Sequence, residues 1–387
     1  MNTNPIQYID TPAALEQLCQ QLHDAPWIAL DTEFLREKTY YPQLCLLQLG
    51  TTEITACIDP LALPNLDPLL PLFDNPNITK IFHAGSQDLE ILFQLNGRLP
   101  SPLFDTQIAA PLLGHNEQIG YANLVNEVLG VQLEKAHSRA DWTRRPLPEA
   151  QINYAADDVI YLGQIYKKLQ QQLQQKDRLQ WLDDDFQALT DTGRYQIDPN
   201  TIWQKLRGLE RLKGESLSIA QQLCIWREEQ AQKKNLPRKW LLKDEVVLDL
   251  ALQKPNNQIE LGHIRGLTDR FVKQTGKVLL KLLSEARQQQ PQPLPAFMKK
   301  KRPKAEHEAV ADLLMAMVRQ RAEEQSLNPN VITQRKELLK FIQGETDLTL
   351  LSGWRNKMIG ADLQALLNGT ANLSVKGGKL TLNRNPE

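Results

Sequence analysis

The sequence feature that most limits the fold is an apolar run that ends in two acids. Trp27-Ile28-Ala29-Leu30 has the composition of a buried strand, and Asp31 and Glu33 follow it with only Thr32 between them. Side chains two positions apart in a strand point to the same face, with α-carbons roughly 7 Å apart. Two carboxylates on one face at the edge of a core repel each other unless a positive charge lies between them. The sequence therefore predicts a cationic partner at the end of this strand.

The first half of the chain alternates strand and helix patterns. Further strands are predicted at Leu44–Leu49, Ile54–Ile58 and Ile78–His83, the first two joined around Gly50-Thr51-Thr52 as a hairpin. Helices are predicted at Ser86–Leu95 with Ser86 as N-cap, Thr106–Leu113, Tyr121–Leu129, and from Pro148 to about Gln174. Strands with helices between and after them favour an α/β domain with a mixed sheet. Everything beyond the glutamine-rich stretch 170–180 is predicted as helix.

The charge balance differs between the two halves. Residues 1–190 hold 12 Lys and Arg against 24 Asp and Glu, and the chain totals of 45 and 46 leave 33 against 22 for the remainder. An acidic half joined to a basic half suggests a charged partner such as nucleic acid. No apolar run approaches the ~18–20 residues of a membrane span. The four cysteines lack paired spacing, which is typical of core thiols in a reducing compartment, so we expect a cytoplasmic protein without a membrane partner.

The second half contains two similar segments separated by a linker. Arg227 and Arg319, like Pro237 and Pro329, are 92 residues apart, and a leucine-rich helical pattern follows each proline. The linker is Pro-rich and then basic, ending near Lys299-Lys300-Lys301-Arg302, where we expect nonspecific phosphate contacts. The expected organisation is an α/β domain at 1–175, a helical linker at 176–206, a helical domain at 207–290, the linker at 291–304 and a second helical domain at 305–387.

Four acids and one tyrosine carry the candidate chemistry. Asp88 falls in the first turn of the helix after the IFHAG run, and Tyr154 and Asp158 are one helical turn apart. Together with Asp31 and Glu33 they could converge at one edge of the sheet. Clustered hard oxygen ligands select Mg²⁺ or Mn²⁺, and two such ions can drive phosphodiester cleavage. Each acid taken singly also has a non-catalytic interpretation, such as an interaction with the helix dipole for Asp88.

The same residues carry a family resemblance. The stretches LDTEF, HAGSQDLEIL and YAADDVIYL match in order and spacing the three motifs of the DEDD 3′–5′ exonucleases, and Tyr154 resembles the tyrosine of the DEDDy subgroup. FDTQIAAPLLG and LEKAHSRADWTRRPLPEAQI are similar to the ribonuclease D family. The two C-terminal segments resemble HRDC domains; the second departs from the pattern by having Val318 where Trp226 stands in the first. This resemblance implies a ribonuclease H-like mixed sheet flanked by helices, followed by two small all-α HRDC-type domains.

The resemblance also implies roles for individual residues. Asp31, Glu33, Asp88 and Asp158 would bind two divalent ions, Mg²⁺ or Mn²⁺, and Tyr154 would position the hydroxide that attacks the terminal phosphodiester. The helical register from Tyr154 favours Asp158 over Asp157, which lies about 100° away around the helix. Asp157 is then either a helper behind the site or a solvated acid.

The implied activity is trimming of structured RNA precursors from the 3′ end, with tRNA precursors as substrates, RNA contacts aided by the basic half, and no protein partner evident. The nearest alternative is a 3′–5′ DNA exonuclease of the proofreading or helicase-associated type, because the metal chemistry acts on phosphate whatever the sugar. A third reading, a non-catalytic RNA-binding module on an inactive exonuclease fold, should show a lost carboxylate. All four carboxylates are present in this sequence.

Overall fold

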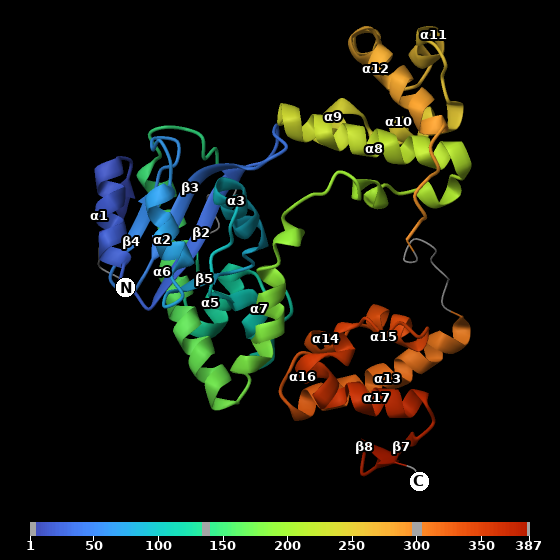
Figure 1. The fold of residues 1–387 in the computed structure, drawn as a ribbon. Coiled ribbons are helices and arrows are strands. Elements are labelled where there is room, and N and C mark those ends of the chain that lie inside the picture. Colours follow the sequence, from blue (N-terminus) through green and yellow to red (C-terminus); the bar gives the residue numbers. More distant parts are fainter. Residues whose placement is uncertain (1–4, 134–139, 296–303, 385–387) are drawn as a thin grey trace. The chain divides into compact units, whose positions relative to one another are not determined.

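The structure is a computed structural model that describes residues 5–133, 140–295 and 304–384, and Figure 1 labels its elements. It divides into two compact units. The first contains residues 1–33, 44–192 and 302–387, and the second contains residues 34–43 and 193–301. The predicted basic run Lys299–Arg302 lies outside the described residues. Within the described ranges, none of the helices has the length and apolar character needed to cross a bilayer.

The first unit is built on a six-stranded mixed sheet with strand order β1-β4-β3-β2-β5-β6. The strands are β1 (Gln7–Ile9), β2 (Trp27–Leu35), β3 (Gln43–Gly50), β4 (Thr55–Ile58), β5 (Thr79–Phe82) and β6 (Leu103–Asp105). β1 runs parallel to β4, and β2, β5 and β6 run parallel to one another, whereas β3 and β4 form the antiparallel hairpin predicted around Gly50. The expected α/β class with a mixed sheet is therefore confirmed.

Strand boundaries differ from the prediction in one respect that concerns the acids. β2 continues through Asp31 and Glu33 as far as Leu35, so both acids lie inside the strand and do not end it. The apolar residues Phe34 and Leu35 extend the strand pattern beyond the acids. β1 and β6 were not predicted, because three residues are too few to show an alternating pattern.

Helices cover the sheet and connect its strands. They are α1 (Pro12–Leu22), α2 (Leu70–Asp74), α3 (Ser86–Asn96), α4 (Thr106–Ala109), α5 (Tyr121–Leu129), α6 (Glu149–Gln175) and α7 (Asp183–Leu189). The predicted N-cap role of Ser86 is wrong, since α3 begins at Ser86 and Gly85 holds the cap position. Asp105 caps α4, accepting hydrogen bonds from the backbone N–H groups of Gln107 and Ile108. The predicted helix Thr106–Leu113 is α4 followed by a 3₁₀ turn.

The long helix α6 packs closely on one face of the sheet because two glycines allow it. A methyl group on Gly50 of β3 would lie 2.9 Å from Cβ of Val159 in α6. A methyl group on Gly163 of α6 would lie 2.5 Å from Cζ3 of Trp27, the first residue of β2, and closer still to Cη2. Contacts this short leave no room for a side chain, so both glycines fix the distance between α6 and the strands.

The second unit is a helical domain with its own core. Its helices are α8 (Gly214–Lys234), α9 (Arg238–Leu241), α10 (Asp244–Gln253), α11 (Gln258–Gly262) and α12 (Asp269–Arg287). Arg227 of α8 is buried and donates to the Leu242 carbonyl and the Asp244 carboxylate, both at 2.8 Å. Tyr40, which lies between β2 and β3, belongs to this unit and donates its hydroxyl to the carboxylate of Glu228.

The C-terminal segment of the first unit repeats part of this arrangement. Its elements are α13 (Ala305–Glu324), α14 (Pro329–Ile332), α15 (Arg335–Ile342), α16 (Gly353–Arg355), α17 (Ala361–Leu367), β7 (Ala371–Lys376) and β8 (Lys379–Arg384). The order of a long, a short and a medium helix is the same as that of α8, α9 and α10. The indole rings of Trp181 and Trp354 stack with centroids 4.7 Å apart, which joins this segment to the region before α7.

The expectation that this second segment is all-helical is wrong, because β7 and β8 form an antiparallel hairpin. Gly377 and Gly378 both have positive φ, 56° and 78°, which suits a two-residue hairpin turn. The flanking residues alternate in the pattern of a strand, with Leu373 and Val375 on one side and Leu380 and Leu382 on the other. The paired glycines between alternating runs were the signal for this hairpin in the sequence.

The close approach of α6 to β2 gives a stability prediction. Gly163→Ala places a methyl group against the Trp27 indole, and overpacking of this kind costs about 1–3 kcal/mol. We expect a lower free energy of unfolding in urea. Gly262→Ala, at a position where nothing lies within 4 Å of the added methyl, is the matched control and should change stability little. Equal effects of the two substitutions would contradict this account of the packing.

Candidate active site

Strand alternation places Asp31 and Glu33 on the face of the sheet that α6 covers. Trp27 lies four residues before Asp31 and six before Glu33, and it turns its indole toward Gly163 of α6. Side chains at even spacing along a strand share one face, so Asp31 and Glu33 point the same way as Trp27. Asp158 of α6 lies one residue before Val159, which contacts Gly50 on the neighbouring strand. The packing of α6 on β2 and β3 therefore brings the third acid to the other two.

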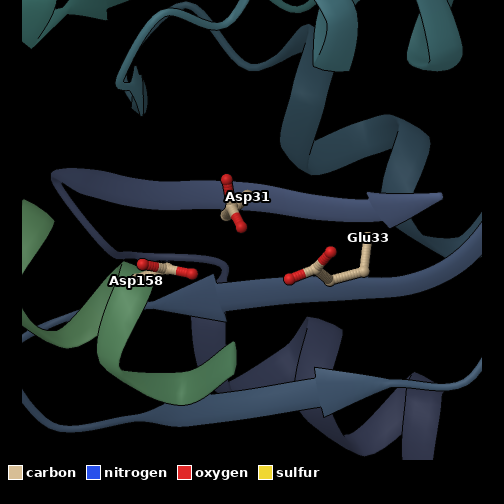
Figure 2. A group of neighbouring side chains, drawn as sticks. All are labelled: Asp31, Glu33 and Asp158. Atoms are coloured by element: carbon tan, nitrogen blue, oxygen red, sulfur yellow. The ribbon is translucent and has the colours of Figure 1, made fainter. Parts of the chain in front are cut away.

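The three carboxylates converge. Asp31, Glu33 and Asp158 each offer an oxygen that lies within 4.8 Å of the others, which is close enough for one cation to bind all three. Figure 2 shows the carboxylate groups of the two strand residues and of the α6 residue turned toward one another. All three side chains are partly buried.

The proximity of these acids shifts their protonation. Burial, followed by the negative charges of Asp158 and Asp88, raises the pKa of Glu33 to about 8. Burial, followed by the charges of Asp157 and Asp88, raises the pKa of Asp158 to about 7. The pKa of Asp31 is raised well above its usual range by burial and by the neighbouring carboxylates. Acids that resist ionisation in this way are the ones that a bound cation would stabilise.

Asp88 does not belong to the convergent group of three acids, although its negative charge helps to raise the pKa of each of them. Its carboxylate accepts a hydrogen bond from the Thr32 hydroxyl, and its side chain is buried in the first turn of α3. Burial raises the pKa of Asp88 to about 6, and the hydrogen bond from Thr32 opposes that rise. Thr32 stands between the two acids of β2 and faces the other way along the strand. Sequence reasoning missed this partner, because a lone threonine in a strand carries no distinctive signal.

Tyr154 lies on α6 one turn before Asp158, and its surroundings are acidic. Burial and the charges of Asp158, Glu33 and Asp31 raise the pKa of Tyr154 to about 12, so its hydroxyl keeps its proton at neutral pH. The indole of Trp142 lies beside it, with ring centroids 6.3 Å apart and an interplanar angle of 32°. Trp142 is 5% exposed and was not among the predicted functional residues.

Other side chains near the site have structural partners. The Tyr121 hydroxyl donates to the backbone carbonyl of Asp157 at 3.0 Å, whereas the Asp157 carboxylate is not part of the convergent group. His83 pairs with the Thr106 hydroxyl and the Ile119 carbonyl, as expected for a packed, hydrogen-bonded histidine. Residues 134–139, part of the stretch compared with ribonuclease D, lie outside the described residues.

The donor set fits divalent cations. Three carboxylates with oxygens in mutual reach are the hard ligands that divalent cations such as Mg²⁺ and Mn²⁺ prefer. Burial and the charges of neighbouring carboxylates raise the pKa values of all three acids. This acidic cluster is therefore compatible with divalent metal binding.

Family models match two parts of the chain. A 3′-5′ exonuclease model matches residues 6–174, and an HRDC domain model matches residues 216–283. The ribonuclease D of Sphingobium indicum is 40% identical, and the match covers 99% of this chain and 100% of that protein. The ribonuclease D of Granulibacter bethesdensis is 38% identical, with 95% of this chain and 94% of the relative covered.

Solved structures agree with these relatives. The crystal structure of Escherichia coli RNase D, described as an exoribonuclease involved in structured RNA processing, superposes with a TM-score of 0.83 at 33% identity. That match covers 94% of this chain and 99% of the other. The catalytic core of RRP6 from Trypanosoma brucei gives a TM-score of 0.58 at 26% identity over 73% of this chain and 80% of that core. With its exonuclease sheet, its acidic cluster and near full-length relatives, this chain belongs to the ribonuclease D family and is a 3′–5′ exoribonuclease.

Proposed function

We propose that this exoribonuclease trims the 3′ ends of structured RNA precursors, tRNA precursors among them, and releases 5′-mononucleotides with two divalent ions, Mg²⁺ or Mn²⁺. The observation that carries the proposal is the convergence of Asp31, Glu33 and Asp158 on one face of the sheet. The Escherichia coli relative acts in structured RNA processing, which supports the same substrate class here. A cytoplasmic location remains part of the proposal and is supported by four free cysteines, three of them buried.

The proposed roles of the residues follow from where they lie. Asp31, Glu33 and Asp158 would hold the ions, and Asp88 would complete the set from the first turn of α3. When bound, divalent ions supply a nucleophile at neutral pH and neutralise charge on the reacting phosphate. Tyr154, protonated at neutral pH, would donate a hydrogen bond to the attacking water and so orient it.

Removing one ligand charge should sharply slow hydrolysis while RNA still binds. Asp158→Asn deletes a charge from the convergent group, and metal-ion stabilisation of the transition state contributes several kcal/mol, so we expect kcat to fall on the order of 10³-fold. The readout is mononucleotide release from a single-stranded RNA. Asp157→Asn makes the same chemical change one residue away, outside the group, and should remain within a few-fold of the unmodified protein. A wild-type rate for Asp158→Asn would disprove this site assignment.

The raised pKa values predict a pH dependence of metal affinity. A divalent ion must displace the protons held by Glu33 and Asp158, whose pKa values are about 8 and about 7. Lowering the pH from 8 to 6 protonates both groups, so Mn²⁺ affinity should weaken by at least about tenfold, the effect of one displaced proton per pH unit. Calorimetric titrations with Mn²⁺ at pH 6, 7 and 8 measure this change. Affinity that is independent of pH over this range would contradict it.

The basic half of the chain is proposed to hold RNA through its HRDC domain. Trp240 of α9 leaves 61% of its surface exposed, unusual for an indole, and Lys233, Lys234, Lys239 and Lys243 around it in sequence are also exposed. Aromatic side chains in a basic surface stack on the bases of single strands while the lysines attract the phosphates. Within the described residues, this combination favours Trp240 as a stacking position for RNA.

Trp240→Ala should weaken RNA binding on the order of tenfold, because stacking of one base contributes about 1–3 kcal/mol. Trp240→Phe keeps an aromatic face and should retain most of the affinity. Ile259→Ala, which truncates another exposed apolar side chain of the same unit, is the control and should bind as the unmodified protein does. Filter binding of a single-stranded RNA measures all three. Equal affinities for Trp240→Ala and Ile259→Ala would remove Trp240 from the RNA interface.

The nearest alternative, a 3′–5′ DNA exonuclease, shares the acidic cluster and its metal chemistry. The relatives that match nearly the full chain are ribonucleases D, which favours RNA. Degradation rates on RNA and DNA oligonucleotides of the same sequence separate the two. Faster degradation of DNA would favour the alternative.

A further inference from the structure

The loop before α6 is held to the sheet by one arginine, Arg145. Its guanidinium binds the Asp59 carboxylate through two nitrogens, Nε to Oδ2 at 2.5 Å and Nη2 to Oδ1 at 2.7 Å. Nη2 also donates to the Cys45 carbonyl of β3 at 2.7 Å. Nη1 donates to the Trp142 carbonyl in the loop itself at 2.8 Å. The guanidinium therefore ties the backbone of the loop to two adjacent strands of the sheet.

The acceptor of this contact is built into the fold. The Asp59 side chain, directly after β4, is 3% exposed, against 26% for Arg145. Tyr8 of β1 donates its hydroxyl to Asp59 Oδ2 at 2.7 Å, and the Leu61 N–H donates to Oδ1 at 2.9 Å. Burial alone would raise the pKa of Asp59, but the hydrogen bonds from Arg145 and Tyr8 outweigh it and hold that pKa below its usual value. The carboxylate is thus charged and fully partnered.

The loop presents a side chain to the proposed site. Trp142, whose carbonyl Arg145 binds, places its indole beside the ring of Tyr154. Among the described residues the indole N–H of Trp142 has no acceptor. The contact with Tyr154 is between the two rings. Tyr154 comes six residues after Pro148, which directly precedes α6, so the loop leads into the start of the helix and also lies against one side of the tyrosine ring.

We propose that Arg145 and Trp142 are positioning residues for Tyr154. The Arg145–Asp59 contact fixes the loop, Trp142 fixes the Tyr154 ring, and the ring direction sets where the hydroxyl meets the attacking water. This inference rests on the proposed role of Tyr154 in hydrolysis. Neither residue is a proposed metal ligand, so their loss should lower kcat while the KM for RNA and the Mn²⁺ affinity stay unchanged.

A double-mutant comparison tests this. Trp142→Ala frees the Tyr154 ring, and we expect kcat to fall roughly 10–100-fold, the effect of a misplacement of about 1 Å. Trp142→Phe keeps a ring in place and should restore most of the rate. If Trp142 acts through Tyr154, Trp142→Ala in a Tyr154→Phe background should lower kcat no further than Tyr154→Phe alone. All rates are measured in the full chain at a temperature where circular dichroism shows it folded.

Arg145→Lys tests the proposed role of Arg145 in fixing the loop. Lysine keeps the charge beside Asp59 but cannot bind the carboxylate and the two carbonyls together, so kcat should fall at a temperature where circular dichroism shows the variant folded. Arg144→Ala removes a neighbouring exposed arginine and should leave kcat as it is. Additive effects of Trp142→Ala and Tyr154→Phe, or a wild-type kcat for Trp142→Ala, would overturn the inference alone. A wild-type kcat for Tyr154→Phe would overturn the proposed role of Tyr154 itself.

Discussion

The repulsion among three neighbouring carboxylates is the constraint on which the rest of the first unit depends. Asp31, Glu33 and Asp158 have oxygens within 4.8 Å of one another, and burial and the charges of neighbouring carboxylates, Asp88 among them, raise their pKa values. A carboxyl whose pKa is higher in the folded chain than in the unfolded one favours folding at low pH. That contribution is lost as the pH rises from the ordinary value of 4.5 through about 8 for Glu33. At neutral pH the metal-free fold therefore carries an electrostatic cost that bound cations would offset.

The surrounding packing holds the acids together against this repulsion. Gly50 and Gly163 let α6 approach β3 and β2 without a gap, which fixes the position of Asp158 over the strand that carries the other two acids. Thr32, on the opposite side of β2, binds Asp88 of α3. Both helices are thus located on β2 by specific contacts. Like-charged side chains that are held this close together need rigid elements around them. Here these elements are the central strand β2 and the 27-residue helix α6.

Much of this arrangement could be predicted from the sequence because its signals are local. The spacing of Asp31 and Glu33 in an apolar run, and that of Tyr154 and Asp158 on a helix, fixes which side chains share a face. The mixed sheet followed from the order of strand and helix patterns. Long-range partners could not be predicted. Nothing near Arg145 indicates that its guanidinium binds Asp59, 86 residues earlier, or that Trp142 lies against Tyr154. The hairpin β7–β8 was missed although Gly377-Gly378 marked its turn.

The division into an acidic and a basic half fits an enzyme that gathers cations in one part and phosphates in another. The acidic cluster is proposed to work only with bound divalent ions. The most direct test is mononucleotide release from a 3′-labelled RNA by protein treated with a chelator, followed by titration of Mg²⁺. We predict no release in the chelator and a rate that rises with added Mg²⁺ until it saturates. Continued release at the full rate in the chelator would contradict the account.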